Sequence, residues 1–214
     1  MRKKQRRNEG KMKKLTGKIR LSLNAPVVIG FSAICFLALA LGWLTQGWTT
    51  QTFFSVYRSS LLSPFTYVRF IGHIFGHANW EHFIGNIMLL LVIGPLLEEK
   101  YGSSNIAFVI LATALVTGLV NFIFFPHAQL LGASGVVFAF ILLSPFTSMK
   151  EGTIPITLLL VAAIYIGEQV YSGIFVQDNI SHLTHILGGF VGSGLGFVMY
   201  KNKMDRAQNY RRLQ

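Results

Sequence analysis

Six apolar segments follow one another along the chain, separated by short polar stretches. They cover residues 25–44, 82–98, 104–125, 133–147, 153–172 and 183–200. About twenty apolar residues are needed to cross the hydrocarbon core of a bilayer. The fourth segment is short for a full crossing, so we expect its helix to begin below the membrane surface, after a loop that dips inward. The pattern predicts an all-α membrane protein, a bundle of six transmembrane helices.

Positive charges are concentrated at the two ends of the chain. Ten of the nineteen Lys and Arg residues lie in the first 20 residues, and five lie in the last 14. Tails and loops rich in Lys and Arg stay on the cytoplasmic side. We therefore expect both termini there, which requires an even number of spans. The short connections at 98–103 and 148–152 each carry a lysine and are expected on the same side.

The composition favours a single membrane domain and leaves little of this sequence for a second, soluble one. The chain is 52% hydrophobic and 13% charged, whereas about a quarter of the residues of soluble domains are charged. We divide it into a basic cytoplasmic tail without fixed structure at 1–24, a membrane domain at 25–200 and a basic cytoplasmic tail at 201–214. We expect the first apolar segment to be a retained span, because no polar cleavage region follows it. Nucleic-acid binding is not expected, because basic tails beside spans set topology and contact anionic lipid.

Two connecting regions have a distinctive composition. The long first connection, 45–81, is rich in Phe, Tyr and Trp, so we expect it to lie partly in the membrane interface. Glu98 and Glu99 end the second segment, and we expect both at a solvated helix end, paired with Lys100 or lipid headgroups. The single cysteine, Cys35, excludes a disulfide framework and a zinc site made of cysteines.

Polar side chains recur at one expected depth. The second, fourth and sixth segments all run from outside to inside, so their first turns share a level near the outer face. That level contains His82 and Asn86, four residues apart on one helix face, together with Ser134 and His185. Polar residues within spans are costly and usually face a partner inside the bundle. These four residues therefore form a candidate site.

Glycines favour a contact between the fourth and sixth segments. His185 lies on a stripe with Gly188 and Gly192, and small residues let a neighbouring backbone approach closely. The serine of the fourth segment is flanked by Gly132 and Gly135. If the stripe meets the start of the fourth segment, Ser134 and His185 come within hydrogen-bond reach.

The chemistry available to such a group is acyl transfer. A neutral imidazole is the usual base that takes the proton of a serine nucleophile. Asn86, His82 and the free N–H groups at the start of the fourth helix can donate to a developing oxyanion. None of the eight Asp and Glu residues lies on the His185 face within a turn or two. We therefore interpret the pair as a Ser–His dyad without a third member.

The chain resembles the rhomboid intramembrane serine proteases across essentially all of residues 25–200. The matching pieces, in order, are "HANWEHFIGN" ending at Asn86, "GPLLEEKYG", "GASG" around Ser134 and "THILGGFVGSGLG" around His185. Each piece alone is modest, but the set in this order is specific.

The resemblance implies a role for each residue of the candidate site. Ser134 would be the nucleophile, and His185 the general base and later the acid. His82 and Asn86 would form the oxyanion hole, where Gly132 allows close approach. The supporting residues would be Phe138, whose ring lies against the histidine, together with Gly135, Gly188 and Gly192.

The resemblance also implies a substrate class and a location. The protein would cleave transmembrane segments of other membrane proteins near the outer leaflet, at sites with Gly, Pro or polar residues. It would lie in the cytoplasmic membrane of a bacterium, with its active site open to the extracytoplasmic side. No metal, nucleotide or other cofactor is implied, and the oligomeric state is left open.

Three alternatives stay open at this point. A rhomboid-like protein that has lost activity would bind or escort membrane proteins, although such proteins lack the serine, the histidine or both. A transporter is disfavoured, because the two halves show no pseudo-repeat. His73, His77 and His82 suggest a metal site, but zinc usually needs three or four ligands and a second shell. We expect instead that His73 and His77 hold the end of the first connection by hydrogen bonds.

Overall fold

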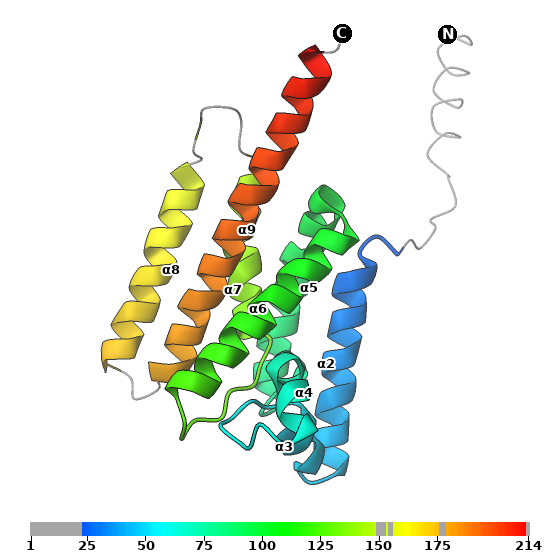
Figure 1. Cartoon of the computed structure of the whole chain (residues 1–214), viewed down its shortest axis with the longest axis vertical. Helices are drawn as coiled ribbons and strands as arrows, with labels where there is room; N and C mark the ends of the chain where they lie inside the picture. Colours follow the sequence, from blue (N-terminus) through cyan, green and yellow to red (C-terminus); the bar gives the residue numbers. More distant parts are fainter. Residues whose placement is uncertain (1–22, 149–152, 154–155, 176–178, 213–214) are drawn as a thin grey trace, which may run out of the picture.

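Helices make up almost the whole of the computed structural model, which describes residues 23–148, 153, 156–175 and 179–212 (Figure 1). The α-helices are α2 (Pro26–Leu44), α3 (Trp48–Phe53), α4 (Pro64–Gly72), α5 (Trp80–Tyr101), α6 (Ser103–Phe124), α7 (Ser134–Leu143), α8 (Ile156–Phe175) and α9 (Asn179–Arg212). Two 3-10 helices, η1 (His73–Phe75) and η2 (Ser144–Ser148), follow α4 and α7. Within the described residues, strand pairing is limited to an isolated antiparallel bridge between Val56 and Leu130. The predicted all-α class is confirmed.

Each of the six predicted apolar segments corresponds to a helix. By length and composition, α2, α5 and α6 are long and apolar enough to cross a membrane. The fourth segment forms the short apolar stretch Ser134–Thr147, preceded by a loop, as its length predicts. Helix α9 continues beyond residue 200 to Arg212, so most of the stretch assigned to the second tail is helical. The first tail lies almost wholly outside the described residues.

The short helix α7 lies inside the bundle. It contacts α9, α5, α6 and α8, and α2 and α8 lie on opposite sides of the bundle (Figure 1). Val136, Val137, Phe140 and Leu143 of α7 are each at most 2% exposed. Helix α7 is therefore positioned on all sides by its neighbours.

Glu98, expected at a solvated helix end, is instead buried, with 3% of its surface exposed. Its Oε1 and Oε2 accept the N–H groups of Val27 and Val28, each at 3.0 Å, and Oε1 also accepts the Ser103 hydroxyl at 2.7 Å. The first amides of a helix have no partner inside the helix, and an anion there is also favoured by the helix dipole. The expectation is therefore wrong for Glu98, which caps α2 from α5, while Glu99 is exposed.

The first connection is attached to the end of α6. Arg58 donates from Nε to the Phe122 carbonyl at 3.1 Å and from Nη2 to the Ile123 carbonyl at 3.0 Å. Asn121 donates from Nδ2 to the carbonyls of Val56 at 3.1 Å and Ala128 at 3.3 Å. The Arg58 bonds satisfy carbonyls at the end of α6, and the Asn121 bonds hold the first connection beside the loop that leads into α7.

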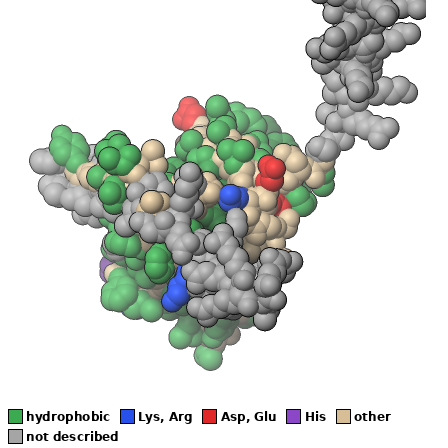
Figure 2. All heavy atoms as spheres, turned by 90° about the horizontal axis from the view of Figure 1, so that it is seen from above, with side chains coloured by type: hydrophobic (Ala, Val, Ile, Leu, Met, Phe, Trp, Pro, Cys, Tyr) green, Lys and Arg blue, Asp and Glu red, His purple; other side chains and the backbone are tan. Residues whose placement is uncertain are grey.

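Charged side chains are visible at the end of the bundle where α2 begins and α9 ends. Figure 2 looks onto this end and shows acidic and basic side chains among hydrophobic ones. On the flanks of the bundle, Leu37 of α2, Met88 of α5 and Phe108 of α6 are each more than half exposed. An apolar flank of this kind is expected where helices face lipid.

Replacing Glu98 by Ala is expected to loosen α2. Two buried N–H groups lose a charged acceptor, so Glu98→Ala should lower the free energy of unfolding by about 3 kcal/mol. Thermal unfolding in detergent, followed by circular dichroism, measures the effect. The matched control is Glu99→Ala, which removes an exposed carboxylate from the same helix turn. Equal midpoints for the two variants would contradict the capping role.

Candidate active site

The first turn of α5 is held by its N-cap residue. Asn79 precedes the helix, and its Oδ1 accepts the backbone N–H of His82 at 2.8 Å. This is the usual capping bond of an asparagine to the third helical residue. It fixes the backbone from which the His82 ring projects and, one turn later, the position of Asn86.

Asn86 carries an unsatisfied buried donor. Its side chain is 7% exposed, and its Nδ2 has no hydrogen-bond partner within the described part of the chain. A buried polar group without a partner costs about 1–3 kcal/mol, so such a group calls for an explanation. The unpaired Nδ2 is explained if it donates to an oxygen of a bound molecule.

Gly132 brings His82 and Ser134 to one point. Its φ of +130° is a conformation that residues with a side chain rarely adopt, and its N–H donates to the His73 carbonyl at 2.9 Å. A Cβ at this position would lie 2.8 Å from His82 Cε1, 2.9 Å from His82 Nε2 and 3.7 Å from the Ser134 Oγ. The imidazole and the hydroxyl therefore both border the space that glycine leaves empty.

Ser134 is the first residue of α7. The first backbone bond of the helix runs from the Val137 N–H to the Ala133 carbonyl, at 3.0 Å. The N–H groups before it have no carbonyl to bond within the helix, and the positive end of the helix dipole lies there. The half-buried hydroxyl thus lies beside backbone donors that can stabilise negative charge.

Helices α7 and α9 are in backbone contact, as the glycine stripe predicts. A Cβ on Gly188 would overlap the carbonyl group of Gly135, and a Cβ on Gly192 would overlap that of Ala139. Only residues without a side chain allow this approach. The start of α7 is therefore pressed against α9, three residues after His185.

The ring of His185 lies flat against the ring of Phe138. Their centroids are 4.1 Å apart and their planes are inclined by 17°. Phe138 is one turn after Ser134, so the two residues share a face of α7. The structure thus brings predicted site residues together in two pairs. Gly132, two residues before Ser134, contacts His82, and Phe138, four residues after Ser134, contacts His185.

His77 supports the site, a role that the sequence analysis missed. Its ring lies edge-on to His82 at 5.2 Å and to Phe83 at 5.4 Å, and its Nδ1 is 3.2 Å from the Phe75 carbonyl. Because a carbonyl only accepts, Nδ1 carries the hydrogen. His77 lies in the loop before α5 and His82 in the first turn of the helix, so the five-residue spacing between them follows no helical period.

His73 links the first connection to the loop before α7. Its Nδ1 is 3.1 Å from the Arg69 carbonyl, its Nε2 is 3.2 Å from the Thr117 hydroxyl, and its own carbonyl accepts the Gly132 N–H. The expectation of hydrogen bonding is confirmed for His73, whereas His77 bonds to the Phe75 carbonyl of its own loop and its buried Nε2 has no partner within the described residues. Both nitrogens of His73 are engaged within the protein, which disfavours its role as a metal ligand.

Both of these imidazoles lie in the first connection and are kept neutral by their surroundings. Burial lowers the pKa of His73 to about 4. The pKa of His77 is lowered to about 4 by burial and, secondarily, by the charge of His82. Each ring therefore functions at neutral pH as an uncharged hydrogen-bonding and packing group.

Acidification is expected to destabilise the folded protein. As the pH falls below 6.5, the unfolded chain protonates these two histidines, whereas the folded chain does not until near pH 4. Stability should therefore fall between pH 6.5 and 4, by about 3 kcal/mol for each histidine. Thermal midpoints measured at pH 7, 5.5 and 4.5 test this.

Two variants assign the pH effect to its residues. His77→Gln should lessen the slope, whereas His127→Gln, which changes an exposed ring, should leave it intact. A midpoint that is unchanged between pH 7 and 4.5 would contradict the expectation.

Comparison with known proteins gives a consistent set of relatives. A model of the Rhomboid domain matches residues 64–202. The chain is 31% identical to Rhomboid-related protein 2 of Mus musculus over 161 residues, which are 65% of this chain and 53% of that protein. It is 28% identical to Rhomboid-like protein 11, chloroplastic, of Arabidopsis thaliana over 148 residues, 62% of this chain and 52% of that protein.

A bacterial relative is also similar. The chain is 24% identical to Rhomboid protease GluP of Bacillus subtilis (strain 168) over 169 residues, 76% of this chain and 32% of that protein. The matched parts are about half or less of the length of each of these three relatives. The Rhomboid domain covers more than half of the chain described here and includes the whole candidate site. The chain is therefore a multi-pass membrane protein that belongs to the rhomboid family.

Proposed function

We propose that the protein is an intramembrane serine endopeptidase that cleaves transmembrane segments of other membrane proteins. The observation that carries the proposal is the geometry around Gly132, which leaves the Ser134 hydroxyl and the His82 imidazole facing one small space. The stacking of His185 on Phe138, one turn along α7, supports the approach of a base to the same serine. Membership of a family with proteases among its members agrees with this chemistry.

In the proposed mechanism, Ser134 and His185 act as a dyad. The neutral imidazole of His185 takes the hydroxyl proton as Oγ attacks the substrate carbonyl, and a tetrahedral intermediate forms. The protonated imidazole then gives this proton to the leaving amine, and the acyl group stays on Ser134. A water molecule, deprotonated by His185, hydrolyses the ester and frees the enzyme. Phe138 holds the imidazole plane during both halves of the cycle.

The oxyanion is proposed to form between α5 and the start of α7. The Asn86 Nδ2, which is buried without a partner within the described residues, would donate to it, as would the His82 ring. Backbone N–H groups at the start of α7 add fixed dipoles. These donors are held in place before substrate binds, so little reorganisation is needed as negative charge develops.

We further propose six spans with both termini in the cytoplasm of the cell. The Lys and Arg residues at both chain ends support this orientation. So does Figure 1, in which the start of α2 and the end of α9 lie at the same end of the bundle. Ser134 would then lie near the extracytoplasmic side, from which water enters.

The substrates are proposed to be transmembrane helices that unwind easily. A carbonyl inside an intact helix is already hydrogen-bonded, and exposed backbone is not tolerated in lipid. Helices with Gly, Pro or polar residues near the outer leaflet would open at the lowest cost. The proposal involves no metal and no cofactor.

Cleavage of a transmembrane substrate in detergent or liposomes tests the proposal. Ser134→Ala and His185→Ala should each reduce the rate by about 10³-fold or more, because the nucleophile or its base is lost. Asn86→Ala should reduce it by about 10²-fold. The matched control is Ser144→Ala, which removes a serine hydroxyl at the opposite end of α7, one bonded to the Ile141 carbonyl.

A fluorophosphonate probe separates catalysis from mere binding. Labelling is expected on Ser134 and should be lost in the His185→Ala variant. A protein that binds transmembrane helices equally well with Ser134→Ala, and that neither cleaves them nor reacts with the probe, is a non-catalytic member of the family. That result would reject the proposed protease.

A further inference from the structure

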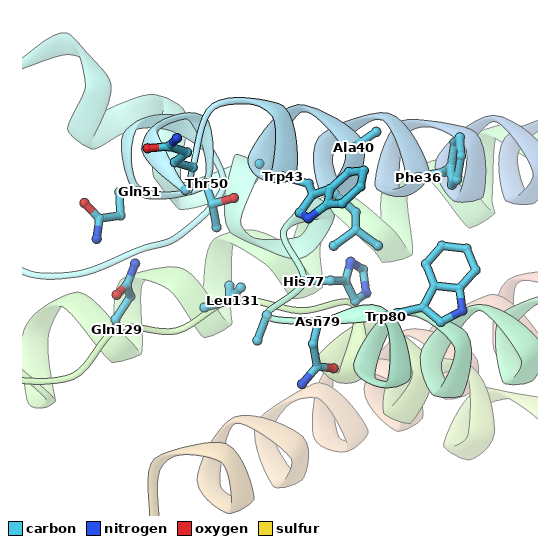
Figure 3. Close-up of a pocket in the computed structure, with 15 residues that line it drawn as sticks. Phe36, Ala40, Trp43, Thr50, Gln51, His77, Asn79, Trp80, Gln129 and Leu131 are labelled. Atoms are coloured by element: carbon cyan, nitrogen blue, oxygen red, sulfur yellow. The ribbon is translucent and has the colours of Figure 1, made fainter.

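A cavity of about 930 Å³ lies beside α2 and the loop that leads into α5, outside the candidate active site (Figure 3). Within the described part of the chain, none of the four residues proposed for the chemistry lines it. One wall is apolar and belongs to α2, with Phe36, Leu39, Ala40 and Trp43. This volume is in the range of cavities that bind small molecules.

The cavity changes from apolar to polar along its length. The apolar wall covers about two turns of α2, from Phe36 to Trp43. Beyond it, the lining includes the polar side chains of Gln46, Thr50, Gln51 and Gln129, while His77 and Asn79 line the cavity from the loop before α5. This order is the order of groups in an amphiphile, with a hydrocarbon chain at one end and a hydrogen-bonding region at the other.

Two exposed tryptophans border the cavity. Trp43 from α2 and Trp80 from the start of α5 are 85% and 56% exposed and line the cavity from two different helices (Figure 3). Indole rings are enriched where membrane lipid meets water. Trp80 lies beside Phe36 at one end of the apolar wall, with ring centroids 6.4 Å apart, and Trp43 lies at the other end. In the proposed orientation, the Trp43 end is the one nearer the outer headgroups.

A second cavity adds positive charge next to the polar end. It has a volume of about 400 Å³, shares Gln51 and Gln129 with the first, and is also lined by Arg58 and His127. No acidic side chain lines either cavity among the described residues. The Arg58 Nε and Nη2 bond to α6 carbonyls, and its Nη1 has no hydrogen-bond partner within the same residues.

We propose that the two cavities together bind one phospholipid of the outer leaflet. One acyl chain lies along α2 between Phe36 and Trp43, the glycerol region meets the amides, and the phosphate lies at Arg58 and His127. A charge-assisted bond from guanidinium to phosphate is among the stronger hydrogen bonds. The binding site adjoins the proposed active site through His77 and Asn79, and it braces α2 against the loops on which Asn79 and Gln129 lie.

Lipid retention and thermal stability measure the binding. The full chain is purified in a neutral maltoside detergent and titrated with phosphatidylglycerol, with a diacylglycerol of the same chains and with glycerol phosphate. Because a ligand of the folded state raises its stability, phosphatidylglycerol should raise the thermal midpoint and be retained in native mass spectra. The diacylglycerol should do so more weakly, and glycerol phosphate should have no effect.

A pair of α2 variants tests the acyl slot. Ala40→Phe fills the slot and should weaken retention of phosphatidylglycerol by about tenfold or more. The matched control is Leu37→Phe, which adds a ring on the lipid-facing side of the same helix, where Leu37 is 58% exposed and outside the lining. Equal retention by the two variants would overturn the proposal.

A charge variant tests the phosphate site and leaves the slot intact. His127→Glu changes an exposed residue, so it should fold normally, and its carboxylate should repel the phosphate. It should weaken phosphatidylglycerol binding by about tenfold while diacylglycerol binding is unchanged. Equal binding of both lipids by the native chain and this variant would overturn the headgroup assignment.

A polypeptide is the alternative occupant. If Ala40→Phe retained phosphatidylglycerol like the native chain but raised the KM for a transmembrane substrate, the cavity would be a substrate site and the lipid proposal would be wrong. Loss of lipid binding with unchanged KM would support it. Labelling of Ser134 by the fluorophosphonate probe tests the protease, and lipid retention tests the lipid site. Failure of one proposal can therefore be distinguished from failure of the other.

Discussion

The geometry of the site depends on the backbone contact between α7 and α9. Gly188 packs against the Gly135 carbonyl group and Gly192 against that of Ala139. Helix α7 has only ten residues, so its length does not fix its position across the bundle. Its neighbours fix it, and the closest of them is α9. A side chain at Gly188 would push the start of α7 outward, and Ser134 would move away from the helix that carries His185.

The other half of the site depends on a network of bonds in the loops. The N–H of Gly132 is tied to the His73 carbonyl, and Leu130 is paired with Val56. These links join the loop before α7 to the first connection, which also carries His77 against the His82 ring. The proposed oxyanion side is thus positioned by backbone bonds between two loops, while the proposed nucleophile and base are carried by packed helices. The two halves meet at Gly132.

The sequence predicted the features that follow from hydropathy and short-range spacing. Long apolar segments, the short fourth helix after its loop and the glycine face of α9 all leave a periodic signal. The burial of Glu98 leaves none, because a glutamate at the end of an apolar segment is normally solvated and its partners are more than 60 residues earlier in the chain. His77 was missed for a similar reason, since its contact with His82 depends on the path of a loop. The helical extension of α9 to Arg212 was missed because the end of an apolar run is not the end of a helix.

The Glu98 cap also means that the start of α2 stays incomplete until α5 has been made. Val27 leaves the ribosome 71 residues before Glu98. At the usual rates of translation this interval lasts roughly 4 to 14 seconds. Until α5 is made, the first amides of α2 can be satisfied only by water or lipid headgroups, so the first span enters the membrane with an open end. Docking of α5 then closes it, which links the completion of α2 to the synthesis of a helix about 70 residues further along the chain.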